Sequence, residues 1–133
     1  KLHSSRENIS VVCDQIGCIT STDTLANICW LIVQRNLVEN FKNQKILHWT
    51  DNGVASWYDL AFAIGEIGFE IGLLKRKSKV KPISSHQYPS KVFRPFYSVL
   101  ESQETKKLLK IDGSHWLESL REILETIKKL EKK

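Results

Sequence analysis

Apolar residues recur at helical spacing in four segments of the chain, and these segments predict its helices. The first runs from Leu25 to about Asn36. The second opens at Ser56, which with Asp59 has the arrangement of a capping box, and continues to about Ile71. Residues 102–109 predict a short third helix, and Ser114 is the expected cap of a fourth that ends near Ile127.

Three shorter segments predict strands. Ile9–Cys13 is rich in β-branched residues, Lys45–Thr50 precedes a turn at residues 51–53, and Val80–Ser84 is expected at a sheet edge because Pro82 cannot donate to a ladder. Strands that alternate with helices indicate an α/β protein. Three short strands cannot cover the apolar faces of four helices, so we expect this sheet to belong to a larger fold.

Glycine is frequent in the second predicted helix, where residues 65, 68 and 72 each weaken it by about 1 kcal/mol relative to alanine. Close packing against a neighbour would offset this cost.

Length and composition are those of one globular domain: 133 residues, 41% hydrophobic and 26% charged. The longest apolar run, Ile28–Val33, is too short to cross a bilayer, and no basic-then-apolar leader opens the chain. Because the sequence begins with Lys1 and contains no methionine, we expect it to be part of a longer protein. These features predict a cytoplasmic location and no membrane partner.

Charge and cysteine content exclude little. The net charge is +5, and five basic residues lie in Lys75–Lys81, a run that we interpret as a solvated connection and not as a nucleic-acid site, since no aromatic residue interrupts it. The three cysteines have no CxxC spacing or matching histidine pair. We expect them to be reduced and half-buried: Cys13, Cys18 and Cys29.

Residues 86–98 (HQYPSKVFRPFYS) have no periodicity of helix or strand and hold two of the three prolines. Pro89 and Pro95 fix their own φ and keep Tyr88 and Arg94 extended, which predicts a stiff loop. The planar guanidinium of Arg94 suits a phosphate or diphosphate, and the neighbouring aromatic side chains could stack on a base or sugar ring. Alternatively, Arg94 pairs with a local carboxylate and the aromatic side chains fill core.

The same stretch, with Tyr88-Pro89, Arg94-Pro95 and Ser98-Val-Leu100, resembles the YPTPARRPxNSxL motif of dTDP-4-dehydrorhamnose reductases, which are extended short-chain dehydrogenase/reductases. Three further blocks are similar to that family in the same order. VVCDQIGCIT (residues 11–20) resembles VVxDQxGxPT, ILHWTDNG with SWY (46–58) resembles IYHLAGxGxTSWYEFA, and GSHW (113–116) resembles the start of the last helix.

The resemblance implies the C-terminal, substrate-binding part of a Rossmann-type reductase that uses NADPH to reduce the 4-keto group of dTDP-4-dehydro-6-deoxy-L-mannose to dTDP-L-rhamnose. It implies that the chain binds the dTDP-sugar, with Arg94 on the diphosphate and Gln15 and Thr20 facing the nucleotide-sugar. Ser98 and Tyr88 are further candidates. It also implies a homo-oligomer, while magnesium, which some relatives hold at a dimer contact, has no carboxylate pair at metal spacing here.

Two elements of the family chemistry are absent from the sequence: a glycine-rich turn for the cofactor pyrophosphate and a Tyr-x-x-x-Lys pair for proton transfer. Family order places both before Lys1, so NADPH would be bound by an N-terminal half outside this chain. We expect residues 1–133 to hold no catalytic residue and to be inactive alone.

Departures from the family pattern keep other functions open. Ile19 stands where the family has proline, Phe93 where it has an arginine, and Tyr97 where it has asparagine. A related sugar-nucleotide reductase or epimerase, or a non-catalytic binding module of the same fold, remains an alternative. His48 is interpreted as structural because of its strand position. His86 and His115 look like catalytic candidates only in isolation. The tryptophans at positions 30, 57 and 116 are interpreted as core.

Overall fold

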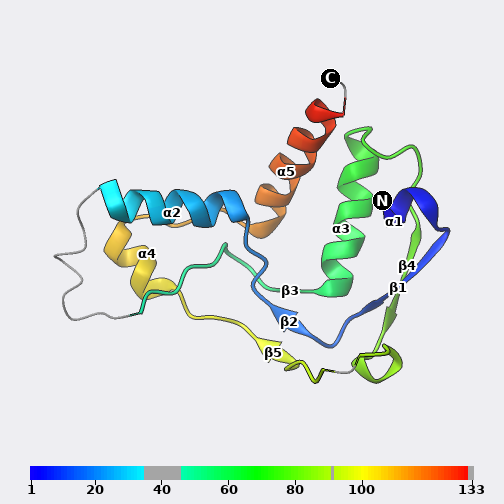
Figure 1. Ribbon diagram of the computed structural model, residues 1–133, viewed down its shortest axis with the longest axis horizontal. Coiled ribbons are helices and arrows are strands. Elements are labelled where there is room, and N and C mark those ends of the chain that lie inside the picture. The colour runs from blue at the N-terminus through cyan, green and yellow to red at the C-terminus, as the bar shows by residue number, and fades with distance from the viewer. Residues whose placement is uncertain (35–45, 91, 132–133) are drawn as a thin grey trace.

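The computed structural model describes residues 1–34, 46–90 and 92–131. It has an α/β architecture with short strands and mostly helical mass (Figure 1), as the sequence predicts. In chain order the elements are α1 (Leu2–Ser5), β1 (Asn8–Val12), β2 (Ile16–Gly17), α2 (Thr22–Gln34), β3 (Ala55–Ser56), α3 (Trp57–Glu70), β4 (Lys79–Ile83), a 3₁₀ turn (Ser85–Gln87), β5 (Tyr97–Ser98), α4 (Gln103–Leu109) and α5 (Trp116–Leu130).

Two small sheets organise these elements. In the first, β1 and β4 pair in parallel from Asn8↔Lys79 to Val12↔Ile83. In the second, β2 lies in the middle, antiparallel to β3 and parallel to β5. Figure 1 shows α3 and α5 between the β1–β4 pair and the α2–α4 side of the molecule.

The core is divided into two clusters. The larger lies where α3 and α5 pack together and includes Ala63, Ile67, Trp116, Leu120 and Leu124. The smaller joins α2 to α4 through Ile28, Trp49 and Leu109, and Leu109 is fully buried.

The predicted strand at 45–50 is wrong over residues 46–50, which form no strand; Lys45 lies outside the described residues. The pattern was misleading because Trp49 and Thr50 are buried by packing next to α2 and α4 and not by a strand ladder. The strand predictions at 9–13 and 80–84 are confirmed within one residue by β1 and β4.

Helix positions agree with the local signals, with small corrections at the ends. The capping box of Ser56 and Asp59 is present at the start of α3. The first predicted helix begins earlier than expected, at Thr22, and its last two predicted residues lie outside the described ranges. The cap of α5 is His115 and not Ser114, because His115 Nδ1 accepts a hydrogen bond from Leu117 N at 3.3 Å.

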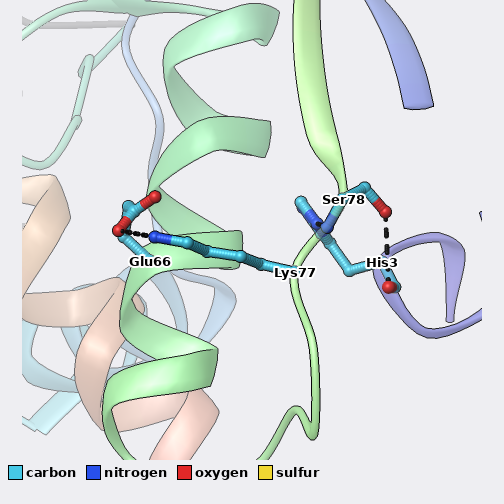
Figure 2. Close-up of polar contacts among 4 residues, drawn as sticks. All are labelled: His3, Glu66, Lys77 and Ser78. Atoms are coloured by element: carbon cyan, nitrogen blue, oxygen red, sulfur yellow. Dashed lines mark hydrogen bonds and ion pairs between the residues drawn. The ribbon is translucent and has the colours of Figure 1, made fainter. Parts of the chain in front are cut away.

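The segment that approaches Gly65 of α3 is α1. His3 is buried, its Nε2 donates to the Ala61 carbonyl at 2.9 Å, and its Nδ1 accepts from Ser78 N at 3.2 Å. A Cβ on Gly65 would lie 2.7 Å from His3 Cε1, so this close contact requires glycine. Figure 2 shows His3 beside Ser78, at the start of β4.

The basic run that precedes β4 is partly engaged in local contacts. Lys77 forms an ion pair with Glu66 on α3 (Figure 2), and Arg76 donates to the Ser4 carbonyl at 3.2 Å. These contacts hold the connection between α3 and β4 against the surrounding helices, which agrees with its interpretation as a structural connection.

Candidate functional site

A cavity of about 620 Å³ lies beside the β3–β2–β5 sheet. We call it the central cavity. Its walls come from three separate parts of the chain: residues 15–20 around β2, residues 55–60 at the start of α3, and residues 94–98 before and in β5. Four of the five sequence-predicted site residues line it: Gln15, Thr20, Arg94 and Ser98.

A second cavity of about 600 Å³ adjoins the first. Its walls include β1 and residues from 85–90 and 92–96, and Tyr88, the fifth predicted residue, lies here and not in the central cavity. Gln15, Trp57 and Arg94 line both cavities, so these three residues form the boundary between them.

Arg94 is exposed, and no hydrogen bond or ion pair to it occurs among the described residues. Both ion pairs in the described part of the chain join other residues, Lys77 to Glu66 and Arg121 to Glu70. The alternative in which Arg94 pairs with a local carboxylate therefore has no support in the structure. A guanidinium with all five donors available at a cavity wall can bind an anion in bidentate fashion.

Gln15 is held by a network that joins two distant segments. The carboxylate of Asp14 accepts from Ser85 N, 2.9 Å from Oδ2, and from Ser85 Oγ, 2.6 Å from Oδ1. Gln15 Nε2 in turn donates to Ser85 Oγ at 2.9 Å. The side-chain hydrogen bond from Ser85, and then the backbone one, lower the pKa of Asp14 below its ordinary value, so that the carboxylate is charged at neutral pH.

Ser98 and Thr20 use their hydroxyl hydrogens on backbone carbonyls. Ser98 Oγ donates to the Ile16 carbonyl at 3.3 Å, across the β2–β5 pair, and Thr20 Oγ1 donates to the Cys18 carbonyl at 3.5 Å. Their oxygens remain able to accept from a ligand. A Cβ on Gly17 would lie 2.9 Å from Ser98 Oγ, so the glycine lets β5 approach the cavity closely.

Residues 51–56 connect the starts of three helices next to this cavity. Asp51, which is 1% exposed, accepts through Oδ2 from Ser21 N at 3.0 Å, and Ser21 Oγ accepts from Asp23 N at the start of α2. The Asn52 carbonyl accepts from Trp116 N at the start of α5, and Ser56 caps α3. We call residues 51–56 the junction loop. Thr20, next to Ser21, and Trp57, directly after Ser56, both line the cavity.

Aromatic side chains of the proline-containing segment are exposed, which contradicts the alternative that they fill core. The exposed fraction is 53% for Tyr88, 81% for Phe93, 46% for Phe96 and 70% for Tyr97. Phe93 and Phe96 make an edge-to-face contact with ring centroids 6.2 Å apart, and both line the second cavity. This wall offers flat apolar surface to a ligand ring.

Sequence reasoning missed Trp57 as a site residue. It was interpreted as core, yet it is 51% exposed and lines both cavities. Its position directly after the cap of α3 was the available signal, because a first-turn side chain has no preceding helical turn to cover it. The core interpretation is also wrong for Trp30, which is 61% exposed, and is confirmed for Trp116, which is buried.

The remaining candidates have other surroundings. His48 is exposed, His86 packs near Phe96 with ring centroids 6.5 Å apart, and His115 is a helix cap. The three cysteines are free as predicted, although only Cys18 is half-buried and the other two are exposed. Within residues 1–34, 46–90 and 92–131, no group of three or more His, Cys, Asp or Glu side chains could hold a metal ion.

The residues of this chain do not fit the pyrophosphate of a dinucleotide, because its six glycines form no glycine-rich turn at a helix start. Of the helices that the structure describes, none is both long and apolar enough to cross a membrane.

The chain is similar to known proteins over most of its length. The family model for the RmlD substrate binding domain matches residues 1–129. The chain is 29% identical to a dTDP-4-dehydrorhamnose reductase of Aggregatibacter actinomycetemcomitans over 92% of its own length and 42% of that protein. It is 33% identical to a spore coat polysaccharide biosynthesis protein of Bacillus subtilis over 94% of its own length and 39% of that protein.

Solved structures show the same likeness. A dTDP-4-dehydrorhamnose reductase of Clostridium acetobutylicum superposes with a TM-score of 0.77 at 30% identity, over 93% of this chain and 40% of that one. The reductase of Bacillus anthracis in complex with NADP superposes with a TM-score of 0.68 at 28% identity, over 91% of this chain and 39% of that one. The chain thus spans about two-fifths of the length of these relatives.

Proposed function

Because the chain belongs to the RmlD substrate-binding domain family, we propose that it forms the nucleotide-sugar binding part of a dTDP-4-dehydrorhamnose reductase. In the full-length protein, the reaction would be the NADPH-dependent reduction of the 4-keto group of dTDP-4-dehydro-6-deoxy-L-mannose to dTDP-L-rhamnose. Residues outside this chain would bind NADPH and transfer the proton, since the chain itself has no glycine-rich turn and no Tyr-x-x-x-Lys pair.

The observation that carries this proposal is the central cavity, which is lined by Arg94 together with Gln15, Thr20 and Ser98. An unpaired guanidinium fits the diphosphate of a nucleotide-sugar, because two parallel N–H···O bonds to an anion are stronger and more directional than neutral ones. The three neutral side chains suit hydroxyl and amide groups. A site built from one cation and several neutral polar groups binds and orients its ligand and does not itself transfer protons.

Steady-state kinetics of the full-length protein test the proposal. We expect NADPH consumption that depends on dTDP-4-dehydro-6-deoxy-L-mannose, with dTDP-L-rhamnose as the product identified by mass spectrometry. Tight binding of the nucleotide-sugar without turnover would instead support a non-catalytic binding module of the same fold. The absence of both binding and turnover would refute the proposal.

A second candidate is a related sugar-nucleotide reductase or epimerase with a different ligand. It is favoured by the exposed Phe93 in the second cavity, at the position where the family motif has an arginine. Phe93 removes a cation from the vicinity of Arg94 and adds an apolar face. If this candidate is correct, the full-length protein will turn over another nucleotide-sugar with a higher kcat/KM than the dTDP compound.

We also propose that the full-length protein is a cytoplasmic homo-oligomer. Support comes from the exposed apolar side chains of α2, Leu25, Trp30 and Val33, whose exposed fractions are 44%, 61% and 59%. Large apolar side chains gathered on an exposed surface can mark an interface. Light scattering of the full-length protein tests the oligomer, and a monomer at micromolar concentration would refute it.

A further inference from the structure

We propose that Asp14 is a positioning residue for Arg94: its carboxylate holds the segment of chain that places the guanidinium at the wall of the central cavity. We call this segment, residues 84–90 and 92–98, the arginine segment. The inference rests on the proposed function, because it explains how the same cavity keeps its cation in place. It follows from the way in which the arginine segment is attached to the rest of the molecule.

The arginine segment is attached near its two ends. Near its start, the Asp14 carboxylate accepts from Ser85 N, 2.9 Å from Oδ2, and from Ser85 Oγ, 2.6 Å from Oδ1. Near its end, Ile16 N donates to the Phe96 carbonyl at 2.8 Å, and β5 pairs with β2. Asp14 and Ile16 are separated by one residue, so a single short stretch between β1 and β2 holds both ends.

Between these attachments, no hydrogen bond joins the described residues of the arginine segment to another part of the chain. The bonds that do occur are internal to the segment. Ser90 Oγ donates to the Val92 carbonyl at 2.9 Å, and Tyr88 N donates to the Ser85 carbonyl at 3.2 Å. Among polar contacts, only those near the two ends therefore fix the position of Arg94.

Ring contacts connect the start of the arginine segment to Arg94. His86 directly follows Ser85, and its ring lies near that of Phe96, with centroids 6.5 Å apart. Phe96 in turn makes an edge-to-face contact with Phe93, the residue before Arg94, with centroids 6.2 Å apart. The two prolines of the segment restrict the backbone between these rings. A shift at Ser85 is therefore transmitted to the guanidinium.

The Asp14 carboxylate suits this task because its two oxygens can accept both donors of Ser85. Hydrogen bonds to a charged group are shorter and stronger than those between neutral groups, and the same bonds lower the pKa of Asp14, the side-chain one first. Asp14 itself lines neither of the two cavities, although Gln15 beside it lines both. It therefore acts on a ligand through the arginine segment and is not a catalytic residue.

Steady-state kinetics of the full-length protein test this role. Asp14→Ala should raise the KM for the nucleotide-sugar about three- to tenfold, the equivalent of one hydrogen bond, and leave kcat and the KM for NADPH unchanged. Asp14→Asn keeps one acceptor oxygen and should restore part of the affinity. A merely structural role would lower the apparent kcat, since less folded enzyme would be present, and a fall in kcat with an unchanged KM would overturn the inference.

Glu70→Ala is the matched control for Asp14→Ala. Glu70 is also a carboxylate whose pKa is lowered by a hydrogen-bonding partner, here Arg121, and it lines neither cavity. Its loss should leave the KM for the nucleotide-sugar at the wild-type value. Equal KM values in Asp14→Ala and Glu70→Ala would show that Asp14 does not position the arginine segment.

A double-mutant cycle shows whether Asp14 acts through Arg94. If it does, the two positions are coupled, and Asp14→Ala in an Arg94→Ala background should raise the KM by about twofold or less. A rise as large as in the wild-type background would mean that Asp14 acts independently of Arg94, which contradicts the proposed role.

A readout without ligand separates this inference from the proposed function. Chymotrypsin cleaves after accessible aromatic residues, and Phe93 is 81% exposed. Because local opening speeds proteolysis, cleavage after Phe93, followed by mass spectrometry, should be faster in Asp14→Ala than in Glu70→Ala. Equal cleavage rates would refute the attachment by Asp14 even if the protein reduces the dTDP-sugar. Faster cleavage, in a protein whose wild type neither binds nor reduces that compound, would refute the proposed function and leave the attachment intact.

Discussion

Substitution of Gly53 by alanine should destabilise the fold through two separate physical effects. Gly53 has φ = +88°, a region in which a residue with a Cβ costs about 1–2 kcal/mol. The added Cβ would also lie 2.6 Å from His115 Nε2 and 2.8 Å from Trp116 Cδ1. Neither group can move freely, because His115 caps α5 and Trp116 is buried, and overpacking of this kind costs about 1–3 kcal/mol. The sum is a loss of about 2–5 kcal/mol in the free energy of unfolding.

Gly72 provides a matched control for this prediction. Its φ is +71°, but an added Cβ would meet only Lys128 Nζ, at 3.6 Å, which is an ordinary contact. Gly72→Ala should therefore show the backbone cost alone, about 1–2 kcal/mol. Urea unfolding of the full-length protein, followed by tryptophan fluorescence, gives both values. If Gly53→Ala destabilises no more than Gly72→Ala, the packing of the junction loop against His115 and Trp116 is not as described.

Three further substitutions test the site and the core. Arg94→Ala in the full-length protein should raise the KM for the nucleotide-sugar more than it changes NADPH affinity. Arg94→Lys should restore part of the lost affinity for the nucleotide-sugar. An unchanged KM in Arg94→Ala would show that Arg94 does not contact the diphosphate. Hydrogen bonds from Ser85 lower the pKa of Asp14 in the folded state, and the charge of nearby His86 lowers it further. The contribution of Asp14 to stability is therefore fully present above its ordinary pKa of 3.8. It is lost as the pH falls through the lowered pKa. Asp14→Asn should flatten this acid limb of the stability profile, and an identical acid limb in the variant would contradict the network. Leu109→Ala, at a fully buried position, should lower the free energy of unfolding by about 2–5 kcal/mol in thermal or urea melts, and a loss below that of an exposed Leu130→Ala control would be inconsistent with the α2–α4 cluster.

The helices could be predicted from sequence because their signals are local. The cap of α3 lies three residues from the side chain that completes it, and the apolar faces repeat within one or two turns. The strands β2, β3 and β5 could not be predicted, since each has two residues and exists only through pairing between distant segments, such as Ile16 with Ser56 and Ile16 with Tyr97. The strand prediction for residues 46–50 was wrong for the opposite reason. An apolar stretch that is buried by side-chain packing has the same sequence pattern as a buried strand.

Part of the site was also within reach of sequence. The proline-bounded Arg94 and the motif around Gln15 identify two walls of the central cavity before any coordinates are known. Trp57 and Ser85 could not be identified, because exposure at a helix start and a contact to Asp14 across 71 positions are both tertiary properties. Tyr88 was predicted for the same site, but the fold places it in the neighbouring cavity.

The junction loop has a consequence for the order in which the molecule folds. Its hydrogen bonds join Asp51 to Ser21, 30 positions away, and Asn52 to the Asp112 and Gly113 carbonyls, 60 and 61 positions away. Contacts of such long sequence separation carry a large loop-closure entropy and are expected to form after the local helices. Amide protons at the starts of α2 and α5 should accordingly gain protection from exchange late and together, so that the central cavity is among the last features of the chain to be completed.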